Sequence, residues 1–180
     1  MMSITEFTAS AKEQDSNISS PITGTSSDLD SPATEDIIPS LPSPPSKIEA
    51  EHYYDGLYSR PILVARSSTI PWKLPTDPEE VKELRPIGNH AIRDAWEGEL
   101  AQKIFAYLDS MKVKWTSIDL VRIGIAEQRS FLPVVWIGVK PSTLSGHDGV
   151  KVVLKCKEIL VEHDITDVDV EIRESEVIRY

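Results

Sequence analysis

The stretch PVVWIGV, residues 133–139, decides the fold class because it is apolar along its whole length. Its short length and its β-branched residues are typical of a strand. A strand with one solvated face alternates apolar and polar residues, so an unbroken apolar run indicates a strand that is covered on both faces or lies centrally in a sheet. We therefore expect a β-sheet with this strand in a central position and with Pro133 at the strand's first position.

The segments that flank this strand predict its neighbours. Residues 115–125 are rich in β-branched side chains and lead through the polar turn 126–130 into the strand, which fits an antiparallel hairpin. After the loop 141–149, apolar residues recur with helical spacing up to about residue 162. Residues 167–174, DVDVEIRE, then alternate strictly, which predicts a strand with one core face and one solvated face. A helix that connects two strands of one sheet predicts that the two strands are parallel.

Further upstream, apolar residues at about every fourth position predict a long helix over residues 89–111, with Asn89 as its N-cap. These residues are Ile92, Trp96, Leu100, Ile104, Leu108 and Met111. The apolar run at residues 62–64 predicts an edge strand. Residues 77–84 predict a short helix with Pro78 in its first turn.

Together these elements predict an α+β domain. The order α-β-β-α-β gives a two-layer sandwich, in which a mixed sheet of three to four strands has its helices on one face. The periodicities place six residues in the core: Ile104, Leu108, Val135, Ile137, Val153 and Leu160.

The first part of the chain has a different composition. Residues 1–47 contain eleven Ser, five Thr and six Pro, and Phe7 is their only aromatic residue. Such a segment buries too little apolar surface to offset the entropy lost on ordering. We therefore expect a disordered Ser/Thr/Pro-rich acidic tail over residues 1–50 and a single α/β domain over residues 51–180.

The tail contains two kinds of short motif. Pro39, Pro42 and Pro45 recur with the three-residue period of a polyproline II helix and are followed by Lys47, which is the form of a ligand for an aromatic groove. A stiff linker explains the same pattern. Three serines precede a proline and are candidate phosphorylation sites: Ser20, Ser31 and Ser43.

The loop 141–149 brings together the three groups of a nucleophilic triad, in Ser145, His147 and Asp148. A triad depends on geometry, with the base between the nucleophile and the orienting acid, and neighbours on one loop rarely reach that geometry. Helix capping explains the same residues, with Ser145 or Asp148 at the N-cap. The exposed amides at this helix start are also a candidate anion site, which the charge of Asp148 disfavours.

Three further features of the sequence are candidates for a metal site, a reactive thiol and a recognition surface. His90 and Asp94 have the spacing of two metal ligands on one helix face, but two ligands do not make a site and no zinc spacing is present, so we predict no metal and no cofactor. Cys156 falls on a buried helix face, which predicts an inert thiol. Trp72 lies in a proline-flanked segment and is the tryptophan that we expect on a recognition surface.

Composition restricts the partners and the compartment. The formal net charge of −10 disfavours contact with phosphates, so nucleic acid is not an expected partner. The longest apolar run, residues 133–139, is far shorter than a membrane span, and no secretory leader is recognised. The single cysteine favours a reducing compartment, and we expect a soluble cytoplasmic or nuclear protein without membrane contact.

Several stretches resemble a family of uncharacterised fungal proteins. They are WTSIDLVRIGI, PVVWIGVKPSTLSGHDGV and CKEILVEHDITDVDVEIRES, and the similarity extends over most of residues 59–176. In larger members a similar module is followed by a segment like a trypsin-type protease, with a GTGGF stretch and a TARHV-like motif. Neither motif occurs in this chain, so the resemblance assigns no catalytic residue. It implies a fungal source and a regulatory or accessory role.

These observations favour a non-enzymatic protein-interaction or regulatory module with a flexible, modifiable tail. The expected partner is a protein. The alternative is an enzyme or a protease-associated accessory domain with its site near the loop 141–149. A pocket that contains His147 or His90 with a second polar group within hydrogen-bond reach would favour the alternative.

Overall fold

The computed structural model describes residues 41–77, 80–128 and 130–176. The chain divides into two compact units, residues 1–36 and 37–180, and every described residue belongs to the second. The predictions for Ser20, Ser31 and Pro39 lie outside the described residues.

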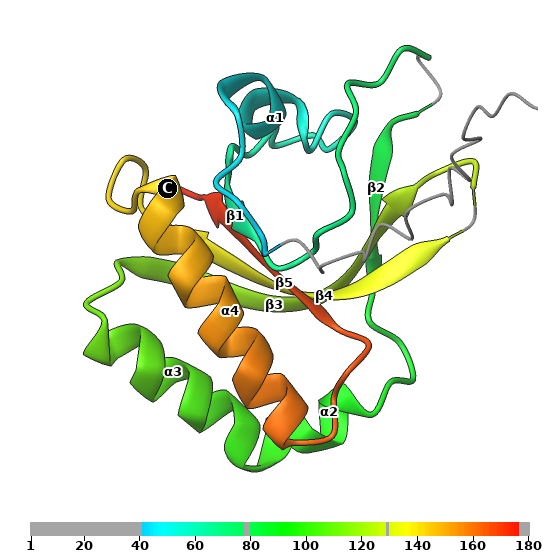
Figure 1. Cartoon of the computed structure of the whole chain (residues 1–180). Coiled ribbons are helices and arrows are strands. Elements are labelled where there is room, and N and C mark those ends of the chain that lie inside the picture. The colour runs from blue at the N-terminus through cyan, green and yellow to red at the C-terminus, as the bar shows by residue number, and fades with distance from the viewer. Residues whose placement is uncertain (1–40, 78–79, 129, 177–180) are drawn as a thin grey trace, which may run out of the picture. The chain divides into compact units, whose positions relative to one another are not determined.

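The second unit is an α+β fold with an open, mixed five-stranded sheet (Figure 1). The strands are β1 (Leu63–Arg66), β2 (Lys82–Pro86), β3 (Trp115–Ile125), β4 (Phe131–Val139) and β5 (Asp169–Glu174), in the spatial order β1-β5-β4-β3-β2. Strands β4 and β5 are parallel, as predicted, and the other neighbours are antiparallel. The sheet therefore has more strands than the three to four that the sequence predicts.

The additional strand is β2, which forms where we predicted a helix over residues 77–84. It pairs in continuous register with β3, from Lys82 opposite Ile125 to Pro86 opposite Val121. The eleven-residue β3 offers a free edge for pairing, and the hydrogen bonds of that edge outweigh a weak local helix preference. The proline is tolerated because β2 is an edge strand and the residue lies at its end.

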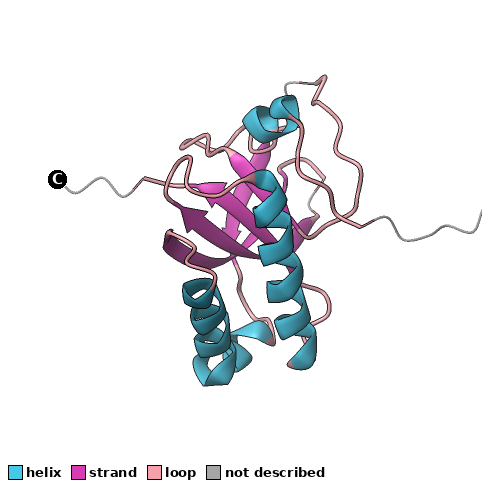
Figure 2. Ribbon diagram, turned by 60° about the vertical axis from the view of Figure 1, so that its left-hand side comes forward, coloured by secondary structure: helices cyan, strands magenta, loops and turns pink. Residues whose placement is uncertain are grey.

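Two long helices cover one face of the sheet, as the two views in Figures 1 and 2 show. They are α3 (Ala101–Ser110) and α4 (Gly146–Glu162). All six predicted core residues are buried between these helices and the sheet. On β4 the core residues are Val135, Ile137 and Val139, each with no measurable exposure.

The predicted helix over residues 89–111 is correct in its location but not in its continuity. It consists of α2 (Ile92–Ala95), a π-helical segment η1 (Trp96–Leu100) and α3. The interruption falls at Gly98, whose ψ of −128° is not helical. Asn89 is not the N-cap, because the cap position of α2 is Ala91, whose side chain makes no capping hydrogen bond. His90 Nδ1 accepts a hydrogen bond from the Ile92 amide at 3.2 Å and so satisfies a donor of the first turn.

The opposite face of the sheet carries the short helix α1 (Lys47–His52), so the helices do not all lie on one face as predicted (Figures 1 and 2). Ser46 caps α1 by accepting a hydrogen bond from the Glu49 amide. The helix crosses the predicted boundary between tail and domain. It leads into a second, smaller core cluster on this face: Tyr54, Leu57, Leu63, Ile123, Val134 and Trp136. The apolar run in β4 is thus covered on both faces, which confirms its predicted central position.

Candidate functional site

The sheet face that carries α1 contains charged and aromatic side chains in register across four strands. Arg66 of β1 lies opposite Glu171 of β5, which lies opposite Trp136 of β4, which in turn lies opposite Asp119 of β3. Residues in register share a face. We call this surface the polar face, in contrast to the aliphatic face under α3 and α4.

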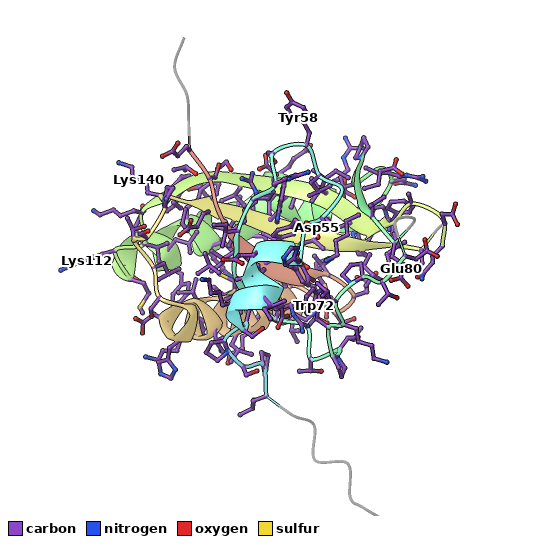
Figure 3. The ribbon with its side chains drawn as sticks, turned by 90° about the horizontal axis from the view of Figure 1, so that it is seen from above. Asp55, Tyr58, Trp72, Glu80, Lys112 and Lys140 are labelled. Atoms are coloured by element: carbon purple, nitrogen blue, oxygen red, sulfur yellow. The ribbon has the colours of Figure 1, made fainter. Side chains whose placement is uncertain are left out.

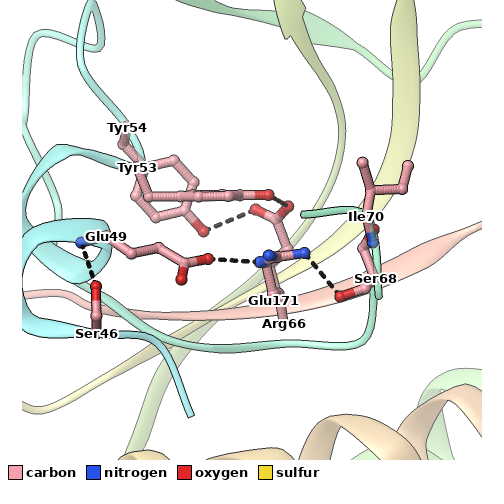
Figure 4. Close-up of polar contacts among 8 residues, drawn as sticks. All are labelled: Ser46, Glu49, Tyr53, Tyr54, Arg66, Ser68, Ile70 and Glu171. Carbon is pink, nitrogen blue, oxygen red and sulfur yellow. Dashed lines mark hydrogen bonds and ion pairs between the residues drawn. The ribbon is translucent and has the colours of Figure 1, made fainter. Parts of the chain in front are cut away.

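Glu171 is the most buried charged residue of the polar face, with 4% of its surface exposed. The hydroxyl of Tyr53 donates to Glu171 Oε1 and that of Tyr54 to Oε2, each at 2.7 Å (Figure 4). Trp136 Nε1 in turn donates to the Tyr54 hydroxyl at 3.0 Å. The prediction of a solvated second face on the last strand is therefore wrong at Glu171, because two tyrosines from the other end of the domain cover it.

The hydroxyls of Tyr53 and Tyr54 act as hydrogen-bond donors to Glu171. Burial, followed by the charge of Glu171, raises the pKa of Tyr53 and of Tyr54 above the usual value for a phenol. Both hydroxyls therefore keep their protons at neutral pH, and each donates a hydrogen bond to the carboxylate. Because both carboxylate oxygens are occupied, Glu171 is held in a fixed position rather than presented as a free base.

Lys82 of β2 lies against the same tyrosines. Its Nζ is 3.0 Å from the centroid of the Tyr53 ring and 5.4 Å from that of Tyr54, which is a cation–π arrangement. Burial lowers the pKa of Lys82 to about 8, and the charges of Glu171 and Arg66 act on it in opposite directions. Within the described ranges, the ammonium group has no ion pair at 4.0 Å or less.

Arg66, by contrast, has direct partners. Its Nε donates to Glu49 Oε1 at 2.8 Å and its Nη1 to the carbonyl oxygen of Ser68 at 2.7 Å (Figure 4). The ion pair is well shielded, with 13% and 15% of the Arg66 and Glu49 side chains exposed. Ser67 Oγ also donates to Asp169 Oδ1 at 2.9 Å. These contacts hold α1 and the loop after β1 against the sheet.

A cavity of about 300 Å³ opens on the polar face between this loop and strands β3, β4 and β5. Its polar lining includes Tyr53, Lys82 and Glu171. The apolar lining comes from the loop and the sheet: Ile70, Pro71, Trp72, Ile125, Leu132 and Val134. This volume lies at the small end of the range for ligand pockets, and the combination of an apolar wall with a few polar groups is typical of them.

Trp72 stands where three hollows meet. Two more, of about 260 Å³ and 270 Å³, are lined by Trp72 and by Pro71, as the first is. The side chain of Trp72 is partly buried and lies on the side of the domain that carries α1 (Figure 3). The tryptophan that the sequence singled out is thus at the centre of the hollowed surface rather than freely exposed.

The structure also brings part of the proline motif to this surface. Pro42 and Ser43 line the third hollow together with Trp72 and Arg66. Ser43 is exposed, so its hydroxyl is accessible for modification. The other two described members of the motif lie apart from this hollow: Pro45 is half-buried, and Lys47 lies on α1, 3.9 Å from Glu51.

The residues of the loop 141–149 perform helix capping in the structure. Ser145 Oγ accepts from the Asp148 amide at 3.1 Å and donates to Asp148 Oδ2 at 2.8 Å. Lys151 pairs with the same carboxylate at 2.9 Å, and the hydrogen bonds from Lys151 and Ser145 lower the pKa of Asp148. His147 is exposed. The serine proton is therefore directed to the aspartate, whereas a triad requires it to be directed to the imidazole.

His90 and Cys156 have structural roles. His90 Nε2 lies 3.1 Å from Asp167 Oδ2, on the loop before β5. Cys156 is buried, and burial raises its pKa to about 12, which keeps the thiol protonated. The described parts of the chain contain no cluster of three metal-ligating side chains. Among their helices, none is both long enough and apolar enough to cross a membrane.

Sequence reasoning found Trp72 but missed its surroundings. The sequence feature that could have pointed to a buried polar contact is the pair of adjacent tyrosines, Tyr53 and Tyr54, just after the tail. Lys82 was missed because its segment was predicted as a helix.

Comparisons with known proteins leave the geometry as the main source of inference. No family model matches the chain, no curated protein is significantly similar to it, and no solved structure matches its fold. The resemblance to the fungal family stays a prediction.

Proposed function

We propose that the domain is a non-enzymatic protein-interaction module and that its binding surface is the polar face around Trp72. The observation that carries this proposal is the meeting of three hollows at Trp72 and Pro71. Tryptophan is enriched among the residues that contribute most to the energy of protein interfaces, where it acts as an anchor between hollows of this kind. A regulatory role in the cytoplasm or nucleus fits the single buried cysteine.

The construction of this surface supports binding rather than catalysis. The carboxylate oxygens of Glu171 are both occupied by tyrosine hydroxyls, and Arg66 is paired with Glu49. These groups are fixed by one another and keep the Trp72 loop in place. A preorganised surface loses less entropy on binding than a flexible one.

The alternative, an enzyme with its site at the loop 141–149, has weaker support. Ser145 and Asp148 are engaged with each other at the start of α4, and the hollows that meet at Trp72 are lined by neither. Neither His90 nor His147 lines any of these three hollows, and His52, which lines one of them 2.9 Å from Asp55, is exposed.

The proposal is tested by placing a photo-crosslinking residue at position 70, which is 64% exposed and lines the first hollow while leaving Trp72 in place, and, as a matched control, at position 161 on the exposed side of α4. Val161 is 48% exposed and lies on α4, which covers the opposite face of the sheet. We expect a discrete crosslinked protein from position 70 in a cell extract and none of the same mass from position 161.

Point variants then separate binding from other effects. Trp72→Ala should reduce capture of that crosslinked partner at least about tenfold, which corresponds to about 1.4 kcal/mol. Ser145→Ala should leave capture unchanged while lowering stability by about 1 kcal/mol through the lost helix cap. Equal crosslinking from both positions, or capture that depends on Ser145 rather than Trp72, would contradict the proposal.

A further inference from the structure

We propose that the cavity beside Trp72 binds a small organic acid, consisting of an apolar or aromatic body with one carboxylate, and that Lys82 binds the carboxylate. This inference goes beyond the proposed function, since it concerns a small molecule inside the cavity rather than a protein on the surface. It stands or falls independently of the protein partner.

The first step is the state of Lys82. Its ammonium group lines the cavity and lies over the Tyr53 ring, without an ion pair or a side-chain hydrogen bond to any described residue. Taking a charged group out of water costs free energy unless a counter-charge compensates it. The depressed pKa reflects this cost. A carboxylate in the cavity would supply the missing counter-ion.

The second step is that the other charges of the cavity are already compensated. Glu171 accepts from Tyr53 and Tyr54, and Arg66 pairs with Glu49. Asp169 accepts from Ser67 and lies 4.0 Å from Lys157. Among the described residues that line the cavity, Lys82 is thus the one charged group without an ion pair or a side-chain hydrogen bond. The polar requirement of the ligand is therefore a single anionic acceptor.

The third step concerns the apolar side chains that line the cavity. Several of the residues that line the cavity are aliphatic or aromatic: Ile70, Trp72, Ile125, Leu132 and Val134. Burial of apolar ligand surface against them stabilises the complex by about 25 cal/mol per Å² of area removed from water. The volume of about 300 Å³ restricts the ligand to a small molecule.

The experiment uses the full chain and two probes of the same shape, naphthalene-2-carboxylate and naphthalene-2-carboxamide. Their dissociation constants are measured by calorimetric titration at pH 7. We expect the carboxylate to bind at least about tenfold more tightly than the amide, because only the carboxylate neutralises Lys82. Chemical-shift changes of backbone amides should concentrate at Ile125, Val134 and Glu171.

Variants then assign the preference to one residue. Lys82→Met keeps the apolar stem over Tyr53 and should bind the two probes equally. Lys82→Arg keeps the charge and should retain the preference, which also guards against a variant that fails to fold. Lys103→Met, at an exposed lysine of α3 that lies 3.8 Å from Glu99, is the matched control and should behave like the unchanged chain.

Three results would overturn the inference: equal affinity for the two probes, a preference that survives Lys82→Met, or no binding of the carboxylate at millimolar concentration. None of them affects the crosslinking result at position 70, so a failure here is distinguishable from a failure of the proposed function.

Discussion

The two faces of the sheet are built on different principles, although they share the same strands. The aliphatic face packs Val135, Ile137 and Val139 of β4 against α3 and α4, and periodicity alone predicts it. The polar face holds Glu171 among aromatic rings and cations, and its stability depends on specific partners. The difference teaches that burial on the aliphatic face needs only apolar volume, whereas burial on the polar face also needs each polar group to find its partner.

The largest effect that we expect tests the aliphatic face. Ile137→Ala removes a side chain with no measurable exposure from the centre of β4, which leaves a cavity under α4. The free energy of unfolding should fall by about 2–5 kcal/mol, measured by urea denaturation. The control is Val161→Ala, on the exposed side of α4, where a change within about 0.5 kcal/mol is expected. Similar losses for both variants would break the comparison.

An intermediate effect tests the polar face. Glu171→Gln keeps the shape of the side chain but removes the charge, and an amide has one acceptor oxygen for two tyrosine donors. We expect a loss of about 1.5–3 kcal/mol in the free energy of unfolding.

A double-mutant cycle sharpens this second test. Combining Glu171→Gln with Tyr53→Phe leaves one tyrosine donor for the one amide oxygen, so the second substitution should cost less than it does alone and the two losses should not add. Additive losses, or a single loss below about 0.5 kcal/mol, would show that the tyrosine–carboxylate contacts do not stabilise the face.

The smallest effect is a pH dependence that separates the faces. Burial lowers the pKa of Lys82 from 10.5 to about 8, so between these values the unfolded chain binds a proton that the folded chain does not. The free energy of unfolding should therefore rise with pH in this window, and the penalty is complete below about pH 8. The charged and titratable groups that act on Lys82 come from α1, the turn after it, β1 and β5: Glu49, Tyr53, Arg66 and Glu171.

Lys82→Met is the matched variant for this measurement because it keeps those groups. From pH 7.5 to pH 9.5, the unchanged chain should gain about 1 kcal/mol relative to Lys82→Met, after allowance for the partial exposure of the lysine. Ile137→Ala should show the same pH dependence as the unchanged chain. A variant without Lys82 that retains the full rise would assign the effect to another group.

The aliphatic face could be predicted from the sequence because its buried apolar residues recur at regular spacing along each element. The spacing of Ile104, Leu108, Val153 and Leu160 identifies buried helix faces without knowledge of their partners, and all four are buried. The same reasoning located α3, α4 and the hairpin of β3 and β4.

The polar face could not be predicted from the sequence, because the positions of its residues depend on contacts between segments that are far apart in the chain. Lys82 lies in a strand only because the edge of β3 is available to residues 82–86. Glu171 alternates like a solvated residue, and nothing near it in the sequence indicates the tyrosines. Trp72 was found by its unusual local context, but its position between three hollows is a tertiary property.

The hydrogen bonds from Tyr53 and Tyr54 to Glu171 span 118 and 117 positions in the chain. Contacts between such distant residues form late in folding, because a long loop must close before they contribute any stability. During synthesis, at about 5–20 residues per second, the tyrosines wait several seconds for the strand that carries their acceptor. The hairpin of β3 and β4 is complete before that strand is made. The polar face therefore cannot be completed until β5 is made, and a nascent chain that lacks β5 also lacks Asp169 and Glu171 of the cavity beside Trp72.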